Sequence, residues 1–283
     1  MKEYEYITSD SELVKFKKYL QIENIEILSM DFEGEYFLHQ YGEELCLIQI
    51  FDGRKYFLID PKNISPNELK NLLENRNITK IFYDASSDKS LVFKKYNINM
   101  NSILDLMDFV QILGFQKRGL GSVLKEILNI EVSNKNKYQK YNWTKRPIQK
   151  DALEYALGDV EHLFNLKDAL MKLIIDRELY ESLILRIVQK DPVVKIHALP
   201  GLKRKRRYKD LKKGSKAEFD KIYDVREEYA KKLNWPPNNV ITNDNIFQLA
   251  ENKVRIDQGI VHFKVPGKYR SEIIRKIDNK KES

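Results

Sequence analysis

The hydrophobic pattern of residues 1–190 contains apolar runs without a helical period, and such runs predict strands. The first three are Ile25–Met30, Glu44–Phe51 and Lys55–Ile59. Asp52-Gly53 separates the second run from the third and is typical of a hairpin turn. Because the three runs follow one another closely, we expect them to form an antiparallel meander.

Further along, two shorter apolar runs predict strands at Lys80–Tyr83 and Ser102–Leu104. In the segments around them, apolar residues recur at helical spacing. These segments predict helices at Ser9–Ile22, Ser65–Asn75, Ser86–Tyr96, Asp105–Leu113 and Gly119–Leu128, and a long helix from about Gln149 to about Gln189 with a break near Arg177. Strands followed by mixed strands and helices indicate an α/β fold with a mixed sheet.

The last third of the chain has a different composition. Its beginning has the features of a linker, namely Pro192, Pro200-Gly201, the basic run KRKRR at 203–207 and Gly214-Ser215. The residues that follow predict helices only, at Glu218–Leu233, Asn243–Asn252 and Tyr269–Ile277. We therefore expect a first domain at 1–192, a basic linker at 193–215 and a small all-α domain at 216–283.

The composition is that of a folded protein, because 42% of the 283 residues are hydrophobic. The N-terminus lacks the apolar stretch of a signal peptide, and no apolar run is long enough to cross a bilayer. Cys46 is the only cysteine, which excludes an internal disulfide and a cysteine zinc cluster; a buried thiol is expected. These features predict a cytoplasmic protein with no membrane partner.

The net charge of +8 is unevenly distributed. Residues 195–283 hold 23 Lys and Arg and 12 Asp and Glu, a net charge of +11, whereas residues 1–194 have a net charge of −3. This asymmetry favours a catalytic body joined to a part that binds a polyanion. The alternative is a lysine-rich surface that only keeps the protein solvated.

Two carboxylates, Asp31 and Glu33, follow the first apolar run, and Gly34 comes directly after them. Side chains two residues apart on a strand point to the same face, so we expect the two acids side by side at the strand's end. A cation or a proton relieves their repulsion, and paired carboxylates suit Mg²⁺ or Mn²⁺. The alternative is an ordinary strand end with solvated acids.

Further candidates lie on the predicted helices. Asp88 is expected in the first turn of a helix, where the helix dipole alone also favours an acid. Tyr155 and Asp159 are four residues apart on the long helix and share a face. Gly158 costs that helix about 1 kcal/mol relative to alanine. It suits the close approach of a backbone, a metal or a phosphate, or else a simple helix–helix contact.

These residues lie in motifs that resemble those of the DEDD-type 3′–5′ exonucleases of the ribonuclease H-like fold, most closely ribonuclease D. The matching segments are Asp31-Phe32-Glu33, LIQI at 47–50, LIDP at 58–61, Asp88 with Leu91, ILD at 103–105, WTKRP at 143–147 and LEYALGDV at 153–160. Glu154 stands where the His subclass has a histidine, so the Tyr subclass is favoured. VREEYAKKLNWPPNNV at 225–240 resembles the helicase-and-RNase-D C-terminal (HRDC) domain.

The resemblance implies a ribonuclease H-like mixed sheet with flanking helices, followed by an HRDC-like domain. It also implies two divalent cations, Mg²⁺ or Mn²⁺, held by Asp31, Glu33, Asp88 and Asp159, with Tyr155 orienting the attacking water. The expected partner is RNA, which would lose 5′-mononucleotides from single-stranded 3′ ends such as those of tRNA precursors. From the sequence, an exonuclease acting on DNA and a non-catalytic nucleic-acid-binding module remain alternatives.

Three positions depart from the family pattern, and none of them is a proposed ligand. Phe32 stands between the first two acids, where threonine is frequent. This difference is expected to alter the contact with the terminal nucleotide. Tyr83 stands where many members have histidine, and Val225 stands where tryptophan is usual.

Overall fold

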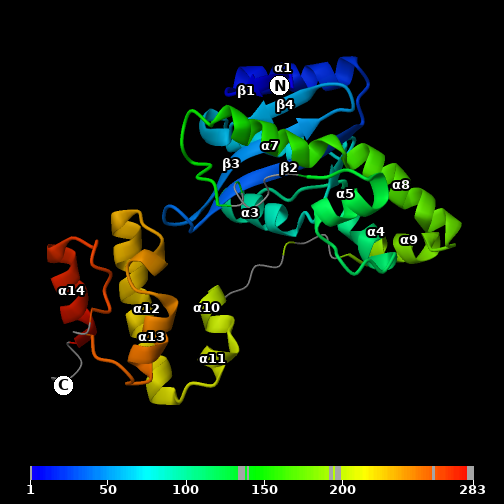
Figure 1. Cartoon of the computed structure of the whole chain (residues 1–283). Coiled ribbons are helices and arrows are strands. Elements are labelled where there is room, and N and C mark those ends of the chain that lie inside the picture. Colours follow the sequence, from blue (N-terminus) through cyan, green and yellow to red (C-terminus); the bar gives the residue numbers. More distant parts are fainter. Residues whose placement is uncertain are drawn as a thin grey trace. The chain divides into compact units, whose positions relative to one another are not determined.

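The computed structural model describes residues 2–132, 138, 140–190, 194, 199–256 and 259–278. It divides the chain into two compact units (Figure 1). The first unit contains residues 1–34 and 44–196, and the second contains residues 35–43 and 197–283. Within the described ranges, no helix combines the length and the apolar character that crossing a bilayer requires.

A six-stranded mixed sheet forms the centre of the first unit, in the order β1-β4-β3-β2-β5-β6. The strands are β1 (Tyr4–Ile7), β2 (Ile27–Tyr36), β3 (Glu43–Phe51), β4 (Tyr56–Ile59), β5 (Thr79–Phe82) and β6 (Ile103–Asp105). β3 runs antiparallel to β4, whereas β1 is parallel to β4 and β5 is parallel to both β2 and β6. The predicted α/β class with a mixed sheet and flanking helices is confirmed.

Helices cover both faces of this sheet. Phe57 and Leu58 are successive residues of β4 and therefore point to opposite faces. Leu58 packs against α7 (Lys150–Glu161), which lies across one face (Figure 1). Phe57 belongs to the core cluster that contains residues of α1 (Asp10–Ile22), α2 (Pro66–Leu73) and α3 (Ser86–Tyr96). A third cluster, around Ile81 of β5, contains residues of α4 (Leu106–Ile112), α5 (Leu120–Leu128), α8 (Leu163–Asp176) and α9 (Tyr180–Gln189).

Local sequence signals explain where several of these elements begin. The hydroxyl of Ser9 accepts a hydrogen bond from the Glu12 N–H and caps α1, and Ser65 caps α2 in the same way. The turn between β3 and β4 has Gly53 at a φ of +94°, a conformation that glycine adopts without strain. Asp60 caps the 3₁₀ turn η1 (Pro61–Asn63) that follows β4.

Three details of the secondary structure differ from the prediction. β2 continues through Gly34 to Tyr36, so Asp31 and Glu33 lie inside the strand and not at its end. The pattern does not predict β1, because its sequence YEYI is only four residues long and contains a glutamate, and only its last residue is buried. The long helix breaks at His162 as well as near Arg177, which produces α7, α8 and α9.

The second unit has its own apolar core, to which Phe219 and Tyr229 of the long helix α12 contribute. Its elements are α10 (Gly201–Arg204), α11 (Arg206–Lys209), α12 (Lys213–Leu233), the 3₁₀ turn η2 (Pro237–Asn239), α13 (Asn243–Ala250) and α14 (Gly267–Asp278). Two of them, α10 and α11, lie in the segment predicted as a linker, and Leu202 is buried in the core of this unit. The limits and roles of the domains stay a prediction.

Candidate metal and catalytic site

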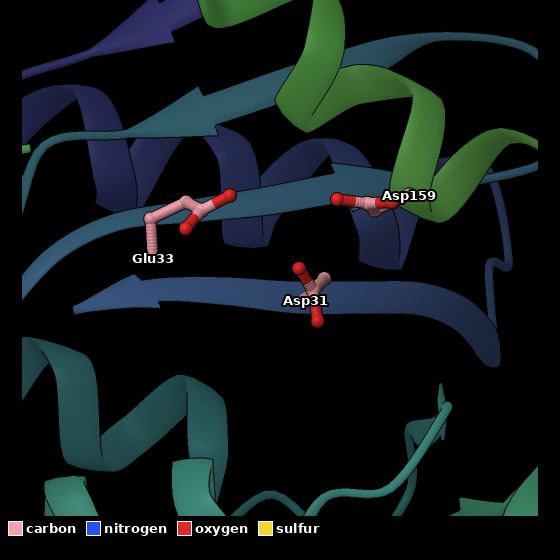
Figure 2. A group of neighbouring side chains, drawn as sticks. All are labelled: Asp31, Glu33 and Asp159. Atoms are coloured by element: carbon pink, nitrogen blue, oxygen red, sulfur yellow. The ribbon is translucent and has the colours of Figure 1, made fainter. Parts of the chain in front are cut away.

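Three carboxylates converge where α7 crosses the sheet. Asp31, Glu33 and Asp159 each place a ligand oxygen within 4.8 Å of those of the other two. Asp31 and Glu33 leave the same face of β2, and Asp159 approaches from α7 (Figure 2). The hydroxyl of Ser29 on β2 donates to the carbonyl of Val160 at 2.7 Å and so fixes the helix on the strand. The structure thus brings together three of the four carboxylates that were predicted as ligands.

The fourth predicted ligand, Asp88, is buried in the first turn of α3, as expected from the sequence. It is not one of the three clustered carboxylates, although its charge raises the pKa of Asp31. Burial, followed by the charges of Asp84 and Asp105, raises the pKa of Asp88 itself to about 7. Its role as a ligand stays a prediction.

The surroundings of the cluster favour protonated carboxyl groups. Burial first, and neighbouring carboxylates second, raise the pKa values of Asp31 and Glu33 well above their ordinary range. In the part of the chain that the structure describes, no basic side chain opposes these shifts; only the N–H of Phe32 lowers the pKa of Asp31. A bound cation would remove this repulsion, and oxygen donors are those that Mg²⁺ and Mn²⁺ prefer. The donor set therefore fits a divalent-cation site.

Tyr155 lies one helical turn before Asp159, and its phenol hydrogen-bonds the Asp159 carboxylate. Burial, then the charges of Asp159 and Glu33, raise the pKa of Tyr155 above its ordinary value of 10. The phenol is therefore protonated at neutral pH and serves as a hydrogen-bond donor, not as a base. Tyr138 stacks on this ring at a centroid distance of 4.9 Å and donates its own hydroxyl to Asp151 at 2.8 Å.

Arg146 has a role that sequence reasoning did not assign. Its guanidinium pairs with Asp60, and its Nη2 donates to Asp60 Oδ1 at 3.0 Å and to the carbonyl of Cys46 at 2.7 Å. Its Nη1 donates to the carbonyl of Trp143 at 2.6 Å. These bonds tie the segment before α7 to β3 and to the end of β4. The Arg146–Asp60 pair thus links the LIDP segment to the WTKRP segment, which leads into the helix that carries Tyr155.

Asp105 supports the turn that leads to Asp88. Its Oδ1 accepts from the N–H groups of Asp84 at 2.8 Å and Met107 at 3.1 Å, which also caps α4. Its Oδ2 accepts from Lys190 at 3.2 Å, at the end of α9. The sequence pattern correctly predicted that a helix starts at Asp105. The hydrogen bond from Lys190 joins residues 85 positions apart, and no local sequence pattern predicts it.

The sequence profile of the 3′–5′ exonuclease family matches residues 4–175, more than half of the chain. The chain belongs to this family. Among curated relatives, ribonuclease D of Haemophilus influenzae is 31% identical over 134 residues, which are 47% of this chain and 33% of that protein. This chain thus spans about a third of the length of that relative. The next two curated relatives are covered over 34% and 22% of their lengths.

Solved structures agree with this assignment at the level of the fold. Escherichia coli RNase D, described as an exoribonuclease involved in structured RNA processing, matches with a TM-score of 0.69 and 19% identity over 99% of this chain and 76% of that chain. Brucella melitensis NrnC with bound Mg²⁺ matches with a TM-score of 0.52 and 20% identity over 65% of this chain and 87% of that chain. Together with the family match, these similarities confirm the ribonuclease D-type resemblance.

Proposed function

We propose that this protein is a divalent-metal-dependent exoribonuclease that releases 5′-mononucleotides from RNA 3′ ends. The observation that carries the proposal is the convergence of Asp31, Glu33 and Asp159 in a chain of the 3′–5′ exonuclease family. The similarity to ribonuclease D supports RNA over DNA as the substrate, and the involvement of the Escherichia coli protein in structured RNA processing supports structured RNA such as tRNA precursors. The cytoplasm is the proposed location.

In this proposal Asp31, Glu33, Asp88 and Asp159 hold Mg²⁺ or Mn²⁺, which when bound lower the pKa of an attacking water and stabilise the leaving 3′-oxygen. Tyr155 orients that water through its phenol oxygen, which accepts a hydrogen bond from the water while its own O–H stays on the Asp159 carboxylate. Because Tyr155 and Asp159 are one turn apart on α7, the same helix sets the position of both groups. The Mg²⁺ bound to Brucella melitensis NrnC supports Mg²⁺ as one of the two candidate cations.

The function is tested with 5′-labelled RNA and DNA of one sequence, each incubated with the protein and Mg²⁺, Mn²⁺ or EDTA. We expect the RNA to shorten from its 3′ end, one nucleotide at a time, with either metal and to stay intact in EDTA. Faster shortening of the DNA would favour a DNA exonuclease. Binding of RNA without shortening under every condition would favour a non-catalytic module.

Gly158 offers a prediction about the path of the substrate. A Cβ atom at Gly158 would meet no described heavy atom within 4 Å, which contradicts the helix–helix contact as its explanation. Gly158 and Tyr155 instead line the same cavity of about 300 Å³. Gly158→Ala is therefore expected to raise the free energy of unfolding by about 1 kcal/mol, through helix propensity alone. It should also lower kcat/KM about tenfold, since overpacking against a bound nucleotide costs roughly 1–3 kcal/mol.

The matched control for Gly158→Ala is Gly121→Ala, on α5, outside the segments proposed to bind RNA. A Cβ atom at Gly121 would meet the Val132 side chain at 3.8 Å, an ordinary van der Waals contact. Urea unfolding and kcat/KM on RNA are measured for both variants. If both keep the kcat/KM of the wild type, no nucleotide comes close to Gly158.

We also propose that 193–215 and the HRDC-like domain at 216–283 bind RNA. Among the described residues, the cations of the basic run 203–207 differ in whether an acid pairs with them. Lys203 pairs with Asp220 at 2.9 Å, and Arg207 pairs with Asp244 at 2.6 Å. The side chains of residues 204 and 205 are exposed, and no acid within the described ranges forms an ion pair with them. Arg206 is exposed too, but it pairs with Asp210 at 3.4 Å. Within the described ranges, residues 204 and 205 are therefore the members of this run whose charge no acid offsets, and they are available to phosphates.

The double variant Arg204→Gln/Lys205→Gln is expected to weaken RNA binding, because each cation that contacts a phosphate releases counterions. The slope of log K against log salt should become shallower by roughly 0.7 per lost contact. Affinity is measured by fluorescence anisotropy in EDTA at several salt concentrations. The control is Lys15→Gln/Lys18→Gln, which removes the same charge from exposed positions of α1. Equal losses in both double variants would mean that only net charge matters.

A further inference from the structure

Gln49 is a fully buried polar side chain for which the described structure offers no hydrogen-bond partner. Its exposed fraction is 0%, and neither Nε2 nor Oε1 has a partner. An unpaired buried amide is unfavourable for folding and is rare in native proteins. Such a group calls for a functional explanation, and the position of Gln49 in the sheet supplies one.

The register of the sheet places Gln49 on the face that α7 covers. Gln49 lies opposite Leu58 in the antiparallel pair of β3 and β4, so both side chains point to the same face. Leu58 belongs to the core cluster that contains Ala156 and Leu157 of α7. The amide is therefore enclosed between β3 and the helix that carries Asp159.

A second contact places Gln49 beside Asp31. β2 and β3 are neighbours in the sheet and follow one another through a hairpin. The hydroxyl of Ser29 on β2 reaches the carbonyl of Phe51 on β3 at 3.4 Å. Asp31 lies two residues after Ser29, and Gln49 lies two residues before Phe51. Two neighbouring strands that a hairpin joins run antiparallel, so these two steps lead to neighbouring positions on the same face.

We propose that Gln49 is a positioning residue whose side-chain amide donates a hydrogen bond to the Asp31 carboxylate when the cluster holds a divalent cation. This inference rests on the metal site of the proposed function. A ligating carboxylate usually receives such outer hydrogen bonds, and they fix its orientation. An amide is suited to this task because it donates without positive charge, whereas a lysine or arginine would compete with the cation for the carboxylate.

The test compares the wild type with Gln49→Met, which keeps the length of the side chain and removes the amide. Leu47→Met is the control, because Leu47 is buried on the same face of β3, in the cluster packed against α7. Binding of Mn²⁺ is followed by electron paramagnetic resonance without RNA, and the melting temperature is measured in EDTA. We expect Gln49→Met to weaken Mn²⁺ binding by about 10–100-fold. Its melting temperature in EDTA should equal or exceed that of the wild type, since no partner is lost.

Two results would overturn the inference. One is an unchanged Mn²⁺ affinity of Gln49→Met; the other is a loss of affinity that Leu47→Met reproduces, which would assign the effect to packing. The proposed function fails separately: wild-type protein that binds Mn²⁺ but leaves RNA intact contradicts the nuclease, and the Mn²⁺ comparison still decides the role of Gln49.

Discussion

Asp31→Asn is expected to reduce RNA hydrolysis about a thousandfold or more while the protein stays folded. Asp31 contributes one of the three clustered carboxylate oxygens. The amide of asparagine is neutral, so it provides no negative charge to balance that of a bound cation. Metal-assisted stabilisation of a transition state amounts to several kcal/mol, and each 1.4 kcal/mol is a factor of ten in rate. Turnover of labelled RNA at saturating Mg²⁺ measures the loss.

The same variant should change how the stability of the metal-free protein depends on pH. The pKa of Asp31 is raised by burial and by the charges of Asp88 and Asp159, so the folded state binds more protons than the unfolded state once the pH exceeds about 4. The stability that Asp31 contributes is complete below that pH and is lost as the pH rises through its folded-state pKa. Asp88, whose pKa is raised to about 7, contributes to the same loss of stability. In EDTA, the melting temperature of Asp31→Asn should therefore fall less between pH 5 and pH 8 than that of the wild type.

Asp52→Asn is the matched control for both measurements. It makes the same chemical change in the turn between β3 and β4, where Asp52 accepts the N–H groups of Arg54 and Lys55 at 2.7 and 2.6 Å. Asn-Gly supports such a turn as well as Asp-Gly does. Near wild-type turnover of Asp31→Asn, with Asp52→Asn equally active, would contradict the assignment of Asp31 as a ligand.

The sequence predicted the parts of the site that depend on local periodicity. Asp31 and Glu33 share a face because strand side chains alternate, and Tyr155 and Asp159 share a face because they are one helical turn apart. That β2 and α7 meet was implied only by the resemblance to ribonuclease D, since 128 residues separate Asp31 from Asp159. The physical reason for the meeting is tertiary: apolar packing of α7 on the sheet and the bond from Ser29 to Val160.

Other features had no local signal that could reveal them. β2 extends past Gly34 because pairing in the sheet outweighs the low strand preference of glycine. The pattern of LIQI marks Gln49 as one polar residue in an apolar run, but whether its amide finds a partner depends on its neighbours in space. The Arg146–Asp60 pair likewise joins residues 86 positions apart. Such contacts become visible only when the register of the sheet and the path of the chain are known.

Tyr155→Phe is expected to slow the chemical step by about 10²–10⁴-fold, the range for loss of a group that handles a proton or orients a reactant. Only the phenol oxygen is removed, and the ring can keep its stack on Tyr138. The clustered carboxylates stay intact, so Mn²⁺ affinity and RNA affinity should change little. Single-turnover rates at saturating enzyme isolate the chemical step from binding and product release.

Tyr138→Phe separates this effect from a loss of packing. It also removes one hydroxyl, which donates to Asp151 at 2.8 Å, and Asp151 is not one of the clustered carboxylates. We expect Tyr138→Phe to lose some stability, about 1 kcal/mol for one hydrogen bond, and to keep a single-turnover rate within a few-fold of the wild type. If both variants slow the reaction equally, Tyr155 acts through the stacked pair and the position of α7. If only Tyr155→Phe is slow, the phenol oxygen itself takes part in the reaction.

The pKa of Tyr155 is raised above 10, so its phenol stays protonated across the neutral range. The ratio of the single-turnover rates of wild type and Tyr155→Phe should therefore be constant from pH 7 to pH 9.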